Sequence, residues 1–377
     1  MKGKEDGSSK LLRALSEVRD PRIDRTKLHP LFNVLVMALC GAITGVSGWD
    51  DLAFFAKVRR EWFAQMLDMP HGTPSADTFR RVFEALDPRE LEGALRTWVA
   101  AVANSFEGEV IAIDGKSLKG AIDRAGATTP LHLLHVWATE QQLLLGQRLV
   151  AGAPGETAGI LELLRQLRIE GSVVTTDANG CTKNVTAAIR EARADYLLAL
   201  KGNRGPLHKH VEERFARSEA TGFRGVPTHR TKDEGHGRKE KRVVRVLSLA
   251  NDLAPVLKGW CDVRSAVLIE RARTIAGKTT LERHFYISSL APDAPRLAEA
   301  IRAHWSIENQ LHWMLDVVFD EDSRTIRDQR SAENFALVTR LALMMLKRCP
   351  EKVSIAMKRK RAGWEPDYVA GLIARGI

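Results

Sequence analysis

The chain has 377 residues, which is enough for a large hydrophobic core divided among two or three domains. Lys and Arg total 57 against 47 Asp and Glu, and the formal net charge of +10 favours an anionic partner such as nucleic acid, without sequence preference. The 4 cysteines are scattered and form no C-x-x-C pair. The sequence therefore indicates neither a cysteine-based zinc site nor a disulfide framework, and it suits a reducing cytosol.

Two stretches bear on export and membranes. Residues 1–10 are polar and charged and lack the apolar core of a signal peptide. The most apolar segment, residues 31–46, is shorter than the roughly 20 residues that a membrane span needs. We therefore expect a buried helix at 31–46 and no membrane partner.

Residues 11–105 predict a helical N-terminal domain. Apolar residues recur at spacings of three and four, as in residues 31–45. Ser75 precedes a further predicted helix, and Asp87 is the expected N-cap of another, with Pro88 in the first turn, where its missing N–H costs nothing.

From residue 109 the pattern changes to short runs of β-branched and apolar residues. Residues 109–114 and 131–152 predict three antiparallel strands, the last two joined by a turn at 140–142. The expected order then continues with a helix at 158–169, a strand at 171–177, a helix at 182–194 and a strand at 195–203. This is a mixed α/β sheet with helices against its faces, in the element order of an RNase H-like core.

The remainder of the chain divides into three parts. Residues from 203 to about 290 are polar and basic with strand-like runs, and they predict a partly β insertion, because a structureless loop of that length is improbable. Residues 295–319 and 331–348 predict helices that complete a catalytic domain spanning 109–348. Residues 349–377 form a basic C-terminal tail with the run KRKR.

Two aspartates follow the predicted strands. In IAIDGKSLKGA, residues 111–121, a buried strand is expected to end on Asp114 before a Gly-Lys-Ser loop, and in GSVVTTDANG another ends on Asp177. At the ends of adjacent strands the two carboxylates would lie within a few ångström and repel, unless a cation such as Mg²⁺ lies between them. Taken singly, each aspartate could instead form a turn or cap a helix.

Glu308 lies in the middle of the predicted helix at 295–319. Spacings of three and four put Ile301, Trp305 and Leu311 or His312 on the packed side, so Glu308 sits close to an apolar stripe. A row at spacings of four contains His304, Glu308, His312 and Asp316.

This row has other interpretations. A zinc site on one helix is an alternative, although the H-E-x-x-H spacing that such sites require is absent. Glu308 could also pair with His304 or His312, or the row could be solvated. The two tryptophans, Trp305 and Trp313, are interpreted as core residues rather than as platforms for stacking bases.

Several motifs resemble the DDE transposases of the ISAs-one insertion-sequence group, which includes the H-repeat-associated proteins. The motifs are IAIDGKSLKGA (111–121), VVTTDANGCTKNVTAAIREARADYLLALKGN (173–203), YISSL (286–290), AIRAHWSIENQLHWMLDVVFDEDSRTIRD (300–328) and SAENFALVTRLALMMLK (331–347). The N-terminal helices are similar too, and the resemblance covers roughly residues 20–348 in order and spacing.

The resemblance implies an RNase H-like core in which Asp114, Asp177 and Glu308 are catalytic and hold two divalent cations, Mg²⁺ or, in vitro, Mn²⁺. It also implies hydrolysis at the ends of a mobile element, followed by attack of the freed 3′-hydroxyl on target DNA, with no covalent enzyme intermediate. The N-terminal helices would form the transposase-associated domain. A cytoplasmic, nucleoid-associated bacterial protein that acts as a homodimer on DNA is expected.

The residues around the third acid follow this group and not its relatives. Related families carry Tyr-x2-Arg-x3-Glu-x6-Lys, whereas Ile301, His304 and Leu315 occupy those positions here, so the roles of the Tyr, Arg and Lys do not transfer. The His-Trp-x-Ile-Glu-Asn form of the group makes His304, Trp305 and Asn309 the expected supporting residues.

Basic residues near the acids are the candidates for phosphate contacts. They are Lys116, Lys119, Lys183, Lys201, Arg204, Arg238, Lys239, Lys241 and Arg242, of which the last four lie in the insertion, where a charge run is usually a solvated face. Two other functions stay open at this point: a domesticated or decayed descendant that binds DNA without cutting it, and a metal-dependent nuclease without strand transfer.

Overall fold

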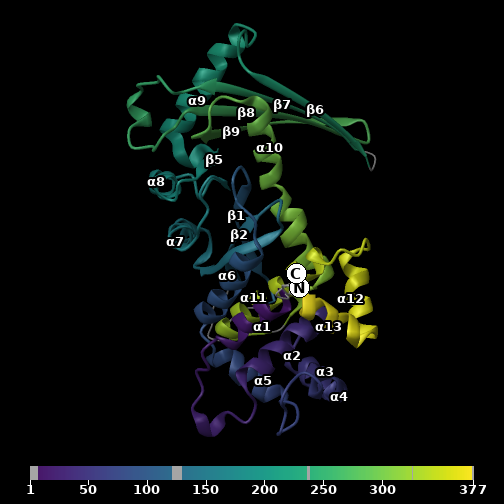
Figure 1. Ribbon diagram of the computed structural model, residues 1–377. Helices are drawn as coiled ribbons and strands as arrows, with labels where there is room; N and C mark the ends of the chain where they lie inside the picture. The colour runs from purple at the N-terminus through teal and green to yellow at the C-terminus, as the bar shows by residue number, and fades with distance from the viewer. Residues whose placement is uncertain (1–6, 121–129, 236–237, 325, 376–377) are drawn as a thin grey trace, which may run out of the picture.

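The structure is a computed structural model that describes residues 7–120, 130–235, 238–324 and 326–375. Within these ranges nine strands form one sheet in the order β3-β2-β1-β4-β5-β9-β8-β7-β6. In Figure 1 the sheet runs from the middle of the molecule to its top, and a group of helices lies below it. The mixed α/β class that the sequence predicts is thereby confirmed.

Three of the N-terminal helices begin where the sequence predicts them, at residue 31, after Ser75 and after Asp87, whereas the first begins at Gly7, before the predicted residue 11. The N-terminal helices are α1 (Gly7–Ser16), α2 (Leu31–Thr44), α3 (Trp49–Val58), α4 (Arg60–Ala64), α5 (Ala76–Ala85) and α6 (Pro88–Val102). The Ser75 hydroxyl accepts a hydrogen bond from the backbone N–H of Thr78, and the Asp87 carboxylate accepts one from Arg89, so both predicted residues cap their helices. Helix α2 is buried along almost its whole length, as its uniformly apolar sequence requires.

The described residues contain no single helix that is long and apolar enough to cross a membrane. The pair α2 and α3 meets the length and composition criteria only when taken together, and it is bent by 98°.

The first five strands surround the predicted carboxylates. β1 (Val110–Leu118), β2 (Leu131–Ala138) and β3 (Leu143–Val150) are antiparallel, and β4 (Val173–Thr176) and β5 (Asp195–Leu200) continue the sheet parallel to β1. Helices α7 (Gly152–Leu164) and α8 (Lys183–Glu191) lie on one side of these strands and α10 (Ala294–His304) on the other (Figure 1).

The residues predicted as an insertion extend this same sheet. They form α9 (Gly205–Ala220), β6 (Thr228–Gly235), β7 (Arg238–Ser248), β8 (Ser265–Ile275) and β9 (Lys278–Ser288). β9 pairs antiparallel with β5, from Leu197 opposite Ser288 to Leu200 opposite Phe285. The backbone groups at the edge of β5 are thus satisfied by a strand almost 80 residues further along the chain, which a local sequence pattern cannot reveal.

One predicted boundary is wrong. The strand expected to end on Asp114 continues through the Gly-Lys-Ser segment to Leu118. The parallel ladder with β4 does end before Asp114, at the pair Ile113 and Thr176, but the antiparallel ladder with β2 continues to the pair Leu118 and Leu131. The segment is a strand because its other neighbour still offers backbone hydrogen bonds.

The helix predicted at 295–319 is also different in detail. α10 ends at His304, and two π-helical segments follow, Glu308–His312 and Met314–Val318. π-helical turns are rare in proteins, and those that occur are often found at functional sites. α11 (Gln329–Arg348) then passes through the core, where residues 331–346 are all buried. Short 3-10 turns cover Asp24–Thr26, Gly202–Arg204, Pro255–Leu257 and Glu321–Ser323.

The basic segment predicted as a tail folds into two helices, α12 (Ile355–Trp364) and α13 (Pro366–Arg375). The buried ammonium group of Lys358 donates to the carbonyl oxygens of Leu346 and Cys349, at 2.9 and 2.8 Å. These carbonyls belong to the end of α11, which has no partners of its own for them. Lys358 therefore completes a helix instead of serving as a free charge.

Candidate active site

The first two predicted acids are neighbours in the sheet. Asp114 follows Ile113 on β1, and Asp177 follows Thr176 on β4, and Ile113 and Thr176 form the last pair of the parallel ladder. The two aspartates therefore occupy equivalent positions on adjacent strands, as expected. Asp177 also forms the predicted turn, because its Oδ1 accepts the N–H groups of Asn179 and Gly180 at 2.9 and 3.4 Å.

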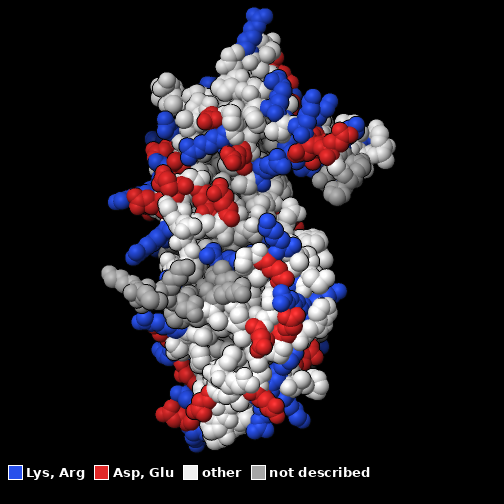
Figure 2. All heavy atoms as spheres, turned by 45° about the vertical axis from the view of Figure 1, so that its right-hand side comes forward, with Lys and Arg blue, Asp and Glu red and all other residues white. Residues whose placement is uncertain are grey.

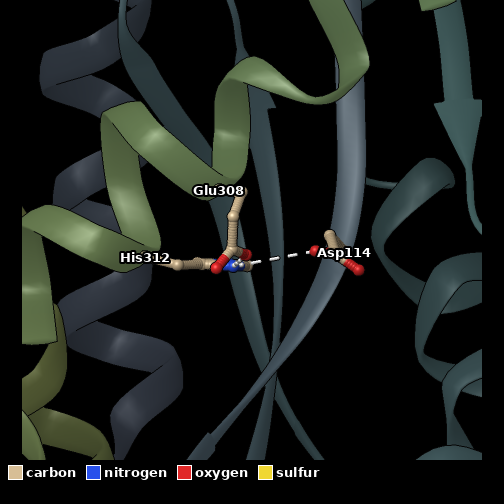
Figure 3. A group of neighbouring side chains, drawn as sticks. All are labelled: Asp114, Glu308 and His312. Carbon is tan, nitrogen blue, oxygen red and sulfur yellow. Dashed lines mark hydrogen bonds and ion pairs between the residues drawn. The ribbon is translucent and has the colours of Figure 1, made fainter. Parts of the chain in front are cut away.

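The third acid meets the first through a histidine. Glu308 opens the π-helical segment, and its Oε2 lies 3.2 Å from Nδ1 of His312 one turn later. The same nitrogen lies 3.6 Å from Oδ2 of Asp114 (Figure 3). One donor atom from each of the three side chains falls within 4.8 Å of the others. His312 is buried, whereas the Glu308 side chain is 61% exposed.

The electrostatics of the three carboxylates differ. Burial raises the pKa of Asp114 to about 6, with His312 opposing the shift and Asp177 and Glu308 adding to it. Burial raises the pKa of Asp177 as well, and the nearby Glu156 carboxylate adds to the effect. The hydrogen bond from His312 lowers the pKa of Glu308. A partly buried group of like charges with oxygen donors fits a divalent cation, which would relieve the cost of ionising Asp114.

A network on the other side of Asp177 was not predicted. The Glu156 carboxylate lies 2.7 Å from Nε2 of His132 and accepts a hydrogen bond from the Asn179 side chain at 2.9 Å. It thereby fixes the turn that carries Asp177. A side chain at Gly115 would collide with His132 and Glu156, so the glycine in the Gly-Lys-Ser segment is the one sequence signal that could have pointed to this network.

The supporting residues do three different things. Nδ1 of His304 lies 2.9 Å from the hydroxyl of Thr175 on β4, and burial lowers the pKa of His304 to about 4, so this side chain is neutral and joins α10 to the sheet. Trp305 is 54% exposed, and Trp313 is 48% exposed, so the prediction that both are core residues is wrong. Trp305 and Asn309 line a pocket of about 790 Å³ that begins at Glu308.

The row of four polar residues does not act as a unit. His304 contacts β4, Glu308 contacts His312, and Asp316 pairs with Lys116. The pairing of Glu308 with His312 is therefore confirmed. His304 and Asp316 have other partners, so the four described side chains do not gather into a zinc site on one helix.

The predicted phosphate-binding lysines on β1 and just after it, Lys116 and Lys119, are already paired. The Lys116 side chain is 6% exposed, and its ammonium group pairs with Asp316 and lies 3.6 Å from Asp322. This contradicts the prediction that Lys116 contacts DNA, since burial and two carboxylates keep it from the surface. Lys119 is exposed, and its ammonium group contacts Asp322 at 2.9 Å.

The basic residues after Asp177 surround the same turn. Nε of Arg204 donates to the carbonyl oxygen of Cys181 at 2.5 Å, and Lys183 donates to that of Lys258 at 2.7 Å. Lys201 is exposed at the end of β5, and its charge acts on the pKa of Asp177 in the lowering direction. Lys201 is thus the basic residue of this group with a direct influence on a predicted acid.

The basic residues on β7 form ion pairs. Arg242 contacts Asp233 and Glu240 at 2.5 and 2.7 Å, and Lys239 contacts Glu234 at 2.7 Å. Lys241 is exposed, and the side chain of Arg238 lies outside the described residues. Figure 2 shows Lys and Arg interspersed with Asp and Glu over the upper part of the molecule, where β6 to β9 lie.

Comparison with known proteins identifies the family. The model of the family described as "Transposase DDE domain" matches residues 105–345, and the model of the family described as "DDE_Tnp_1-associated" matches residues 12–99. The chain therefore belongs to the family of transposases with a DDE domain, a class of nucleic-acid-cleaving enzymes, and the resemblance seen in the motifs is confirmed.

Several relatives match nearly the full chain. "Putative transposase YncI" of Escherichia coli O157:H7 is 32% identical over 97% of this chain and 94% of its own length. "H repeat-associated putative transposase YhhI" of Escherichia coli K12 is 31% identical over 97% of this chain and 98% of its own. A solved structure of the piggyBac transposase synaptic complex with hairpin DNA aligns with a TM-score of 0.41 at 8% identity, over 97% of this chain and 78% of that one.

Proposed function

We propose that this protein is an active DNA transposase of an insertion sequence, with Asp114, Asp177 and Glu308 as its catalytic, cation-binding acids. The observation that carries the proposal is the convergence of the three. Asp114 and Asp177 are equivalent positions on parallel neighbouring strands, and Glu308 arrives from a segment about 130 residues later to share a donor cluster with Asp114. A cation would offset the cost of holding the partly buried Asp114 and Asp177 close together, which burial and mutual repulsion otherwise make unfavourable.

An RNase H-like core is part of the proposal. It is supported by the strand order β3-β2-β1-β4-β5, in which an antiparallel three-stranded unit is followed by two parallel strands with helices between them. In that arrangement a rigid sheet, and not a loop, would set the separation of the first two acids. Rigid placement suits a reaction that requires in-line geometry.

The cations, Mg²⁺ or Mn²⁺, would supply activation of a water or a 3′-hydroxyl and stabilisation of the leaving oxygen. The protein's own groups would do the rest. The three carboxylates hold and space the cations, the turn fixed by Glu156 and Asn179 keeps Asp177 in place, and Lys201 at the end of β5 is the candidate for a phosphate contact.

The DNA would reach Glu308 along the pocket between α10 and the upper strands. Its lining includes Arg296 and Trp305, a charge and an aromatic face that suit a phosphate and an unpaired base. Arg242, Arg271 and Arg302 line it too, and phosphates would compete there with Glu240 and Asp233, with which these arginines pair. The substrate would be the ends of the element and the target DNA. Two copies of the chain would act together, one on each end.

The test is nicking of supercoiled plasmid in Mn²⁺ by the wild type, Asp177→Asn and Glu308→Gln at equal DNA occupancy. Both variants remove a cation-binding charge with almost no change of shape, so we expect at least a hundredfold loss of nicking with unchanged DNA binding. Glu213→Gln, at an exposed position of α9, is the matched control. Retained nicking in either acid variant would refute the assignment of that residue.

A second assay separates the remaining functions. Oligonucleotides that carry the element ends and flanking DNA should be joined to a target plasmid by a transposase. Nicking without joining would indicate a nuclease, and DNA binding with neither activity would indicate a decayed descendant.

A further inference from the structure

We propose that a buried relay, Arg340 to His135 to His312, points one imidazole proton at Glu308, so that His312 is a positioning residue for the third acid and not a ligand of the cations. The inference rests on the proposed function for the role of Glu308. It concerns a histidine that lies among the acids and that the sequence offered only as one of two pairing partners for Glu308 (Figure 3).

The relay runs through three elements. Nε of Arg340 on α11 donates to Nε2 of His135 on β2 at 3.2 Å, and Nδ1 of His135 lies 3.3 Å from Nε2 of His312. The far nitrogen of His312 then faces Glu308 at 3.2 Å and Asp114 at 3.6 Å. All three relay side chains are buried, so water cannot replace any of these partners.

The direction of the first hydrogen bond, from Arg340 to His135, cannot be reversed. The Arg340 guanidinium is held by Glu321, with one contact at 2.9 Å and another that is shorter, and it also donates to the carbonyl oxygen of Ala336 at 3.2 Å. An arginine only donates hydrogen bonds. Nε2 of His135 must therefore accept.

The direction of every later bond follows. Burial holds the pKa of His135 well below its usual range, so the ring is neutral and carries one proton. That proton is on Nδ1, because Nε2 accepts from Arg340, and the Gln147 side chain on β3 is a further hydrogen-bond partner of the ring. His135 then donates to Nε2 of His312, and the proton of His312 is left on Nδ1, directed at Glu308.

Distances alone would allow the opposite assignment. Cis ligands about 2.1 Å from one ion lie roughly 3.0 Å apart, close to the separations of His312 from Glu308 and Asp114. A coordinating Nδ1 must give up its proton, however, and the proton on Nε2 would then face the Nδ1 proton of His135. The clash could be relieved only by moving the His135 proton to Nε2, where it would face the N–H of Arg340. The relay therefore excludes coordination of a cation by Nδ1 of His312.

The consequence is a restraint on Glu308. Its side chain is long and 61% exposed, so without a fixed donor it would sample several rotamers. The His312 proton selects the one that faces Asp114, in the way that partners behind metal ligands orient them.

Two measurements on the folded full-length chain test the relay. With ¹⁵N-labelled histidine, the ring coupling pattern of His312, assigned by its loss in His312→Gln, should be that of the Nδ1–H tautomer with and without Mg²⁺. The Mn²⁺-loaded protein should show no directly bound nitrogen in electron spin echo modulation. An Nε2–H tautomer, or a directly bound nitrogen that disappears in His312→Gln, would overturn the proposal.

A matched pair of variants tests the function of the relay. His135→Gln can accept from Arg340 and donate to His312 through one amide, whereas His135→Leu can do neither. We expect nicking to fall tenfold to a hundredfold in the leucine variant and less in the glutamine variant, with equal DNA affinity of the two. Thermal unfolding checks that both variants are folded at the assay temperature, since the leucine variant leaves the Nε–H of Arg340 without its acceptor. Equal activity of the two variants would contradict the relay.

The outcomes keep the two proposals apart. Absence of nicking in the wild type together with the Nδ1–H tautomer would remove the proposed function and leave the relay. If nicking depends on the three acids but the cation is bound directly to a nitrogen of His312, the proposed function stands and the relay is refuted.

Discussion

Asp114 shows the conflict between stability and function at the scale of one residue. Its carboxyl group is mostly buried beside two other acids, and its pKa rises from an ordinary 3.8 to about 6. The folded state thus binds the proton more tightly than the unfolded state does. The associated stability is fully present below about pH 4 and is lost as the pH rises through 6, by roughly 1.4 kcal/mol for each unit of pKa shift.

We therefore expect Asp114→Asn to be more stable than the wild type at pH 7 in EDTA, by about 1 to 3 kcal/mol. The amide keeps the shape and removes the buried charge. Chemical denaturation between pH 4 and 8 measures the difference, which should shrink toward pH 4 and when Mg²⁺ is added to the wild type. Asp68→Asn, at an exposed position, is the matched control. A destabilised Asp114→Asn at pH 7 would contradict this account.

Helix α11 shows how an element is held in the core by charge. Arg340 and Glu321 form an ion pair in which the side chains are 0% and 2% exposed. Removing one partner of a buried pair leaves an uncompensated charge, whereas replacing both with apolar residues is often neutral. The pair also anchors the relay behind His312.

Arg340→Met should accordingly lower the free energy of unfolding by about 3 to 5 kcal/mol, and the double variant Arg340→Met/Glu321→Met should recover most of it. Urea unfolding of the two proteins gives the comparison. The double variant is also expected to lose nicking activity, because His135 no longer receives a fixed donor. A double variant as unstable as the single one would mean that shape, and not charge, dominates at this position.

The helices and strands also show which structural features can be predicted from the local sequence. Helix caps such as Ser75 and Asp87 were predictable, because a cap is specified by residues within one turn. The length of β1 was not, since it depends on β2, and the break after His304 was not, since the apolar spacing of three and four over 295–319 gave no sign of π-helical turns. The pairing of β9 with β5 depends on contacts remote in sequence.

For the whole molecule the charge of +10 bears on DNA binding, although most basic side chains near the site are paired. If phosphate contacts carry the affinity, the logarithm of the binding constant should fall linearly with the logarithm of salt concentration. Lys201→Ala should reduce the slope by about 1, and Lys116→Met should leave it unchanged. Fluorescence anisotropy over a salt series measures both. A flat dependence would exclude the basic surface as the DNA site.

The sequence by itself determined the family, the helical N-terminal region and the order of the first five strands along the chain, because these follow from local periodicity, caps and motifs. It also brought forward the three acids, since each stands at a recognisable place in a motif. Only the tertiary structure decided that Lys116 is buried, that the upper strands belong to one sheet, and that His312 lies among the acids with His135 and Arg340 behind it. These features depend on which distant segments pack together, and that is set by the whole core and not by any one stretch of the chain.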